Sequence, residues 1–273
     1  MKYMGNKHAI GLIDSGVGGL TVLKEALKQL PNENLIYLGD TARCPYGPRP
    51  AEQVIEFTRQ MTHFLIQKEI KLLVIACNTA TAVALDVIRQ EIDIPVVGVI
   101  LPGTRAAVKA TNNHKVGVIG TQGTIKSASY QKALQEKTPN MQVFSLACPK
   151  FVPLVESNQF LSPVAKKTVA ETLVPLQYSG MDTLILGCTH YPLLRPIIQN
   201  VVGSQVQLID SGAETVGEVS VLLDYFEIAN SSENKKPRYE FYTTGSTKMF
   251  NEIANEWLNN ISVWSKHVNL EGN

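Results

Sequence analysis

The sequence has no long apolar run, no excess of charge of one sign and no close pair of cysteines. No stretch approaches the roughly 20 apolar residues that a membrane-spanning helix needs, and the formal net charge is only +1. A near-neutral chain has no electrostatic reason to bind nucleic acid or an anionic membrane surface. The apolar stretch before Asp14 is too short for a secretory signal. We therefore expect a soluble, cytoplasmic protein with neither nucleic acid nor a membrane as a partner.

The four cysteines are Cys44, Cys77, Cys148 and Cys188, and the five histidines are spread through the chain. This spacing predicts neither a zinc site nor a disulfide framework. A buried cysteine is most often a small, inert apolar side chain. Cys77 and Cys188 are different, because each directly follows a short apolar run and precedes polar, turn-forming residues. Such runs are typical of parallel strands that are buried on both faces.

Hydrophobic residues make up 44% and charged residues 18% of the 273 residues, enough for a substantial core in one large or two ordinary domains. Apolar runs at 8–14, 34–39, 72–76 and 94–100 alternate with helical patterns. This alternation predicts a parallel sheet with right-handed crossovers.

The pattern then repeats, with landmarks of the first half recurring 104 to 111 residues later. The pairs are Gly11 and Gly117, Cys44 and Cys148, Cys77 and Cys188, and the runs 96–100 and 206–210. We therefore predict an α/β fold of two pseudo-symmetric parallel-sheet units, an internal duplication, that face a shared active-site cleft.

The last part of the chain, after Ser211, has no counterpart in the first half. It contains a helical pattern at 213–226, a polar loop SSENKKP, a strand-like RYEFYTT and a second helical pattern carrying Phe250 and Trp257. We expect this tail to pack back on the amino-terminal unit. The predicted domains are then 1–100 plus 210–273, and 101–209.

In open α/β sheets, ligands bind beyond the carboxyl ends of the strands. Two facing units would present Cys77 and Cys188 to a ligand from opposite sides. Asp14 ends a strand expected beside the Cys77 strand, where its carboxylate either accepts a proton, orients the thiol or caps the amides of SGVGG. His190 lies two residues after Cys188 and is equally a candidate assistant or a structural histidine.

Several small polar residues follow strands and precede helices, where hydroxyls, amides and free backbone N–H groups suit a carboxylate. They are Ser15, Asn78, Thr79, Thr121 and Thr189. The Tyr46-Gly47 turn can close over such a ligand. The glycine-rich SGVGG turn lacks both the GxxxxGK[ST] and the GxGxxG spacing, so it does not indicate a nucleotide site.

Four motifs together carry a resemblance to a known family: DSGVGG at 14–19, CPYG at 44–47, ACNTAT at 76–81 and GCTHYP at 187–192. They resemble the signatures of the glutamate racemases, within the aspartate/glutamate racemase superfamily. The resemblance runs from about residue 10 to about residue 213. It implies cofactor-independent interconversion of L- and D-glutamate, supply of D-glutamate for peptidoglycan, and a homodimer.

The resemblance also implies roles for individual residues. Cys77 and Cys188 match the two acid/base residues, and Asp14 and His190 match residues that assist them. Glu156 matches a carboxylate that supports His190. The positions that match the substrate site are Asp14, Ser15, Tyr46, Gly47, Asn78, Thr79, Thr121, Thr189 and His190.

The implied chemistry suits two thiols. Inverting a stereocentre requires a base on one face and an acid on the other, and two identical groups allow the reaction to run in both directions. A free thiol has a pKa of about 8.5 and needs help from its neighbours to ionise. Donors around the substrate carboxylate must stabilise the charge that develops there.

Other functions fit the same residues. An aspartate or hydantoin racemase or a maleate isomerase would use the same cysteine pair. A thiol redox sensor would join Cys77 and Cys188 in a regulatory disulfide, and a carboxylate-binding module would perform no chemistry.

Overall fold

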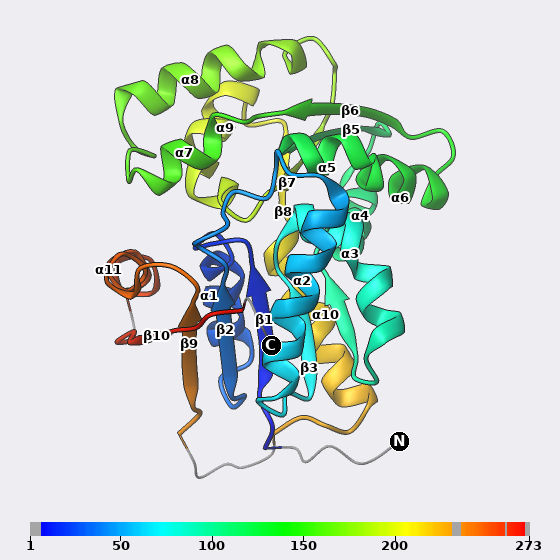
Figure 1. The fold of residues 1–273 in the computed structure, drawn as a ribbon. Helices are drawn as coiled ribbons and strands as arrows, with labels where there is room; N and C mark the ends of the chain where they lie inside the picture. The colour runs from blue at the N-terminus through cyan, green and yellow to red at the C-terminus, as the bar shows by residue number, and fades with distance from the viewer. Residues whose placement is uncertain (1–6, 231–235, 260, 271–273) are drawn as a thin grey trace.

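The computed structural model of the protein describes residues 7–230, 236–259 and 261–270, and it contains two separate parallel sheets (Figure 1). The six-stranded sheet has the order β10-β9-β2-β1-β3-β4, and the four-stranded sheet has the order β6-β5-β7-β8. The first sheet comprises β1 (Ile10–Asp14), β2 (Leu35–Gly39), β3 (Leu72–Ile75), β4 (Val96–Gly98), β9 (Tyr239–Thr243) and β10 (Ser265–His267). The second comprises β5 (Lys115–Gly120), β6 (Gln142–Ala147), β7 (Thr183–Gly187) and β8 (Gln207–Asp210).

The strand order β2-β1-β3-β4 of the first sheet recurs as β6-β5-β7-β8 in the second, and every pairing in both sheets is parallel. Strand β3 precedes Cys77 and strand β7 precedes Cys188, so the two thiols follow equivalent strands. The predicted fold class, two α/β units with parallel sheets, is confirmed.

Helices cover both faces of the six-stranded sheet. Helices α2 (Ala51–Ile66) and α3 (Asn78–Glu91) pack on one face, where Ile13, Leu38 and Ile75 point. Helices α1 (Leu20–Gln29), α10 (Ser211–Tyr225) and α11 (Thr247–Leu258) pack on the other. Apolar side chains on both faces explain why these strands read as continuous apolar runs.

The four-stranded sheet is covered in the same way. On one side lie α4 (Ile100–Ala110), α5 (Gln122–Ser127) and α6 (Ser129–Lys137). On the other lie α7 (Phe151–Glu156), α8 (Pro163–Leu173) and α9 (Arg195–Val202), with 3₁₀ turns at Val174–Leu176 and Tyr191–Leu194.

Helix α4 is an element that the sequence analysis missed. The segment Leu101-Pro102-Gly103 directly follows the predicted apolar run 94–100, and proline and glycine usually interrupt regular structure. Both lie in the first turn of α4, where the missing N–H of proline costs no helical hydrogen bond.

The tail packs back on the first sheet, as predicted. Strand β9 pairs with β2 along its whole length, and α11 lies beside α1 (Figure 1). Most of the SSENKKP loop lies outside the described residues. The division of the chain at residues 100 and 209 stays a prediction.

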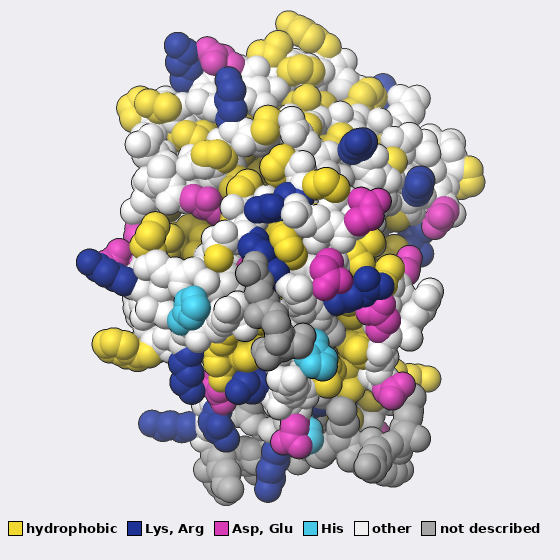
Figure 2. Space-filling view, in the orientation of Figure 1, with side chains coloured by type: hydrophobic (Ala, Val, Ile, Leu, Met, Phe, Trp, Pro, Cys, Tyr) yellow, Lys and Arg dark blue, Asp and Glu magenta, His cyan; other side chains and the backbone are white. Residues whose placement is uncertain are grey.

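Within the described ranges, the helices are all too short or too polar to span a bilayer. On the face drawn in Figure 2, basic and acidic side chains are intermingled, in keeping with the near-neutral net charge.

Candidate active site

A small cavity lies between the carboxyl ends of the two sheets. Its volume is about 20 Å³, counted as the space open to the centre of a water molecule, which is room for one or two waters. The lining residues are Ser15, Cys44, Pro45, Tyr46, Gly47, Cys77, Asn78, Thr79, Thr121, Val152, Cys188, Thr189 and His190. The structure thus brings together, in one enclosed space, both predicted thiols and most of the predicted substrate residues.

Cys77 occupies the N-cap position of α3, directly after β3. Its side chain is 5% exposed, accepts a hydrogen bond from the Ala80 N–H at 3.5 Å and donates to Ser15 Oγ at 3.6 Å. Burial and the nearby charge of Asp14 raise the pKa of the Cys77 thiol to about 12, although the two hydrogen bonds act in the opposite direction. Cys77 is therefore a neutral thiol at pH 7.

Cys188 has a different neighbour, the imidazole of His190. The Cys188 sulfur lies 3.8 Å from His190 Nδ1, and His190 Nε2 lies 3.2 Å from Glu156 Oε1. Burial lowers the pKa of His190, but the hydrogen bonds to Cys188 and Glu156 and their charges outweigh burial and raise it to about 10. His190 therefore carries a positive charge beside the Cys188 sulfur at neutral pH.

Asp14 lies at the end of β1, and β1 pairs with β3 as predicted. Its carboxylate accepts hydrogen bonds from the Gly16 N–H at 3.1 Å and from Thr189 Oγ1 at 3.4 Å. The first bond is the predicted cap of the glycine-rich turn, and the second joins the two units. Burial raises the pKa of Asp14 against the opposing charge of His190. Asp14 does not itself line the cavity.

The hydroxyl and amide groups of the cavity form a set of hydrogen-bond donors. Thr79 Oγ1 and Thr121 Oγ1 are 2.8 Å apart, across the boundary between the units. Asn78 Oδ1 accepts a hydrogen bond from the Tyr130 hydroxyl at 2.7 Å. The Asn78 Nδ2 group is buried and has no hydrogen-bond partner among the described residues. Since a buried donor without a partner is costly, this amide suits an anionic ligand.

Three lining residues were not predicted: Cys44, Pro45 and Val152. Cys44 and Pro45 precede Tyr46 in the CPYG motif, so the motif itself was a usable signal. Val152 comes from α7, and no pattern in the sequence indicates that it approaches the two thiols. Glu156 also comes from α7 and reaches the site only through His190.

Within the described ranges, no three histidine, cysteine, aspartate or glutamate side chains converge in a way that could hold a metal ion.

Known proteins resemble this chain in both sequence and structure. The profile of the Asp/Glu/Hydantoin racemase family matches residues 10–219. The chain therefore belongs to that family, and it is an isomerase. Within the family it groups with the glutamate racemases. It is 71% identical to the glutamate racemase of Enterococcus faecalis, over 99% of both chains, and 64% identical to that of Carnobacterium sp., over 97% of this chain and 99% of the relative.

Solved structures agree with the grouping among the glutamate racemases. Glutamate racemase isoform RacE1 from Bacillus anthracis superimposes with a TM-score of 0.93 at 45% identity, covering 97% of this chain and 98% of the other. The glutamate racemase of Francisella tularensis in complex with D-glutamate superimposes with a TM-score of 0.92 at 34% identity, covering 98% of this chain and all of the other.

Proposed function

We propose that this enzyme interconverts L- and D-glutamate by a two-thiol acid/base mechanism that needs no cofactor. The observation that carries the proposal is the placement of Cys77 and Cys188, which follow equivalent strands of two sheets and line one cavity. The names of the relatives, and the D-glutamate bound to one of them, support glutamate as the substrate.

In the proposed reaction, the thiolate of one cysteine removes the α-proton and the thiol of the other returns a proton to the opposite face. Cys77, as a neutral thiol, is the proposed donor of a proton in one direction. Cys188, next to the positively charged His190, is the proposed acceptor of the α-proton in that direction. In the reverse direction the two exchange roles, with Asp14 and Ser15 as the neighbours that assist Cys77.

We assign the binding of the substrate carboxylates to the donors of the cavity. The Asn78 amide and the hydroxyls of Thr79, Thr121 and Thr189 stabilise the negative charge that builds up as the α-proton leaves. The remaining predicted contacts, from Ser15, Tyr46, Gly47 and His190, complete the pocket.

Replacing each thiol separately tests the mechanism. Cys77→Ser and Cys188→Ser should each reduce racemisation on the order of a hundred- to ten-thousandfold while glutamate still binds in calorimetry. Cys148→Ser is the matched control, because Cys148 is equally buried but does not line the cavity. Each active-site variant should still exchange the α-proton of one enantiomer for solvent deuterium. Racemisation that survives either replacement would refute the two-thiol mechanism.

The same assays separate the alternatives. Turnover of aspartate rather than glutamate would indicate an aspartate racemase. A redox sensor would change its properties with added oxidant, and a carboxylate-binding module would be indifferent to loss of either thiol.

Three further features are part of the proposal: a role in supplying D-glutamate for peptidoglycan, a cytoplasmic location and a homodimer. The first and the third rest on the motif resemblance and on the relatives, and the second rests on the lack of a long apolar run in the sequence. Rescue of a D-glutamate auxotroph tests the first, fractionation of the producing cells the second, and light scattering on the purified protein the third.

A further inference from the structure

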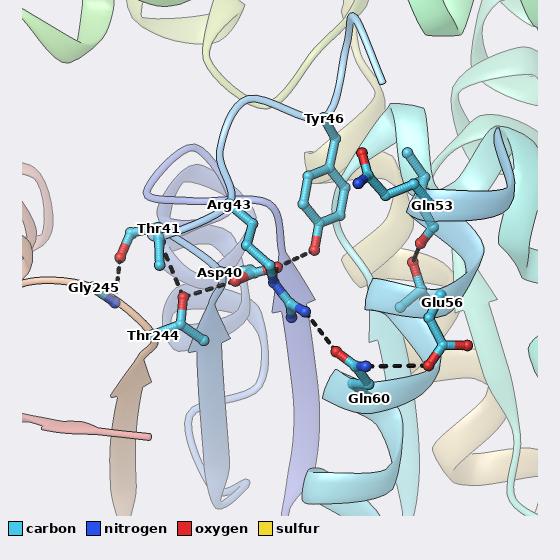
Figure 3. Close-up of polar contacts among 12 residues, drawn as sticks. Asp40, Thr41, Arg43, Tyr46, Gln53, Glu56, Gln60, Thr244 and Gly245 are labelled. Atoms are coloured by element: carbon cyan, nitrogen blue, oxygen red, sulfur yellow. Dashed lines mark hydrogen bonds and ion pairs between the residues drawn. The ribbon is translucent and has the colours of Figure 1, made fainter. Parts of the chain in front are cut away.

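A fully buried carboxylate, Asp40, is hydrogen-bonded to Tyr46, which lines the cavity, and has no role in the mechanism above. Asp40 directly follows β2 and is 0% exposed. Its carboxylate accepts hydrogen bonds from Arg43 Nε at 2.7 Å, from the Tyr46 hydroxyl, and from Thr244 Oγ1 at 2.7 Å (Figure 3). A buried charge is tolerated only with such partners, so the carboxylate and its donors form one fixed unit.

Two of these donors belong to the loop that supplies Tyr46 and Gly47 to the cavity. Arg43 reaches from the loop to α2, where it donates a hydrogen bond to Gln60 Oε1 (Figure 3). Its guanidinium also lies 3.9 Å from the centre of the Phe57 ring. The Tyr46 ring is buried, and its hydroxyl points toward Asp40 (Figure 3). Asp40 thus fixes the loop through its hydrogen bonds with Arg43 and Tyr46.

The third donor comes from the carboxyl end of β9, in the tail that has no counterpart in the second unit. Thr244 Oγ1 donates to Asp40 and accepts from the Ala42 N–H at 3.0 Å. Next to it, the Gly245 N–H donates to Thr41 Oγ1 at 3.0 Å. The tail is therefore bonded to both the carboxylate and the start of the loop.

The held loop also reaches the second unit. The carbonyl oxygen of Gly47 accepts a hydrogen bond from the Gly123 N–H, at the start of α5, at 2.8 Å. The position of the loop therefore decides both the shape of the cavity wall and one contact that joins the two units.

We propose that Asp40 is a positioning residue for the substrate pocket, and that Thr244 in the tail fixes Asp40 so that Tyr46 and Gly47 stay in place. The expected change in KM for glutamate rests on the proposed function. The expected change in the mobility of the loop does not depend on the proposed function.

The test compares Thr244→Val, which removes the hydroxyl, with Thr244→Ser, which keeps it. The Thr244 hydroxyl makes two hydrogen bonds, to Asp40 and from the Ala42 N–H, and a loss of about 0.5–1.5 kcal/mol at the loop corresponds to a rise in KM of roughly two- to thirteenfold. We expect this rise in Thr244→Val, with kcat within about twofold of wild type, and wild-type KM in Thr244→Ser. Amide hydrogen exchange in residues 41–49 should be faster in Thr244→Val only. Thr172→Val is the control, because this variant also loses a hydroxyl hydrogen bond, the one that Thr172 Oγ1 donates to the Thr168 carbonyl within α8.

Asp40→Asn is the second variant. It removes the charge shared by the three donors, so KM should rise further than in Thr244→Val. Unchanged exchange of residues 41–49 in both Thr244→Val and Asp40→Asn would refute the inference. The inference would be equally wrong if amide exchange in residues 41–49 became faster while KM stayed at the wild-type value. It would also be wrong if Thr244→Ser behaved like Thr244→Val. A wild-type protein that does not racemise glutamate would refute the proposed function instead, and the exchange data would still decide whether Asp40 holds the loop.

Discussion

At the scale of single residues, the two sulfurs share a cavity but have different electrostatic surroundings. Cys77 is held by a helix N-terminus and a serine hydroxyl, and burial keeps its proton in place. Cys188 lies beside an imidazole whose other nitrogen contacts Glu156. This asymmetry places a neutral thiol at Cys77 and a positively charged imidazole next to Cys188.

The raised pKa of His190 predicts how stability depends on pH. In the unfolded chain His190 loses its proton near pH 6.5, whereas in the folded protein it keeps it until about pH 10. Between these values the native state binds the extra proton, so the stabilising contribution is complete below pH 6.5 and is lost as pH rises toward 10. For one proton, the free energy of unfolding falls by at most about 1.4 kcal/mol per pH unit.

Urea unfolding of wild type and His190→Gln at pH 7, 8 and 9 measures this contribution. The fall in stability should be steeper in wild type, because the variant lacks the titrating group while other ionisable residues are unchanged. Parallel pH profiles would show that His190 is neutral in the folded protein.

At the scale of elements, the two sheets are linked by the crossing of α4 and α10, which approach closely at Gly103. A Cβ atom at Gly103 would lie 2.7 Å from Ser211 Cβ, at the first residue of α10. Ser211 is itself buried. A side chain at position 103 would therefore force the two helices apart.

We predict that Gly103→Ala lowers the free energy of unfolding by about 1–3 kcal/mol, the usual cost of overpacking. Gly217→Ala is the matched control in α10, because nothing lies within 4 Å of its added Cβ. It should be neutral or stabilising by up to about 1 kcal/mol, through better helix propensity. Denaturant unfolding of both variants gives the comparison, and equal effects would contradict the close crossing.

At the scale of the whole molecule, the small cavity leads us to expect that the two units move apart when an amino acid enters. A space for one or two waters cannot admit glutamate, and the lining comes from both units. Hydrogen bonds that join the two units would break on opening, among them Gly123 to Gly47, Thr79 to Thr121, and Thr189 to Asp14.

Hydrogen exchange of the Gly123 amide reports this opening, since its N–H is bonded to the facing unit. Saturating D-glutamate should slow the exchange at least about tenfold, because bound ligand stabilises the closed form by mass action. The amide of Leu73, inside the first sheet, is bonded to Pro95 O and serves as the reference. Equal protection of Gly123 with and without glutamate would contradict opening between the units.

Much of the molecule was predictable from local patterns. The apolar runs before Cys77 and Cys188 identified the two central strands, because strands buried on both faces have no polar alternation. The helix α4 was missed because Pro102 and Gly103 are helix breakers in general but not in a first turn. Val152 and Asp40 were missed because nothing adjacent in the chain indicates what they contact.

The sequence by itself determined the strand and helix alternation, the repeat and the two thiols, since these depend on composition and on spacing along the chain. Only the tertiary structure decided that Glu156 reaches His190, that Thr244 bonds to Asp40, and that both thiols line one small cavity. Those contacts join residues 34 and 204 positions apart, and their energies depend on burial and distance, which arise only when the two sheets and the tail come together.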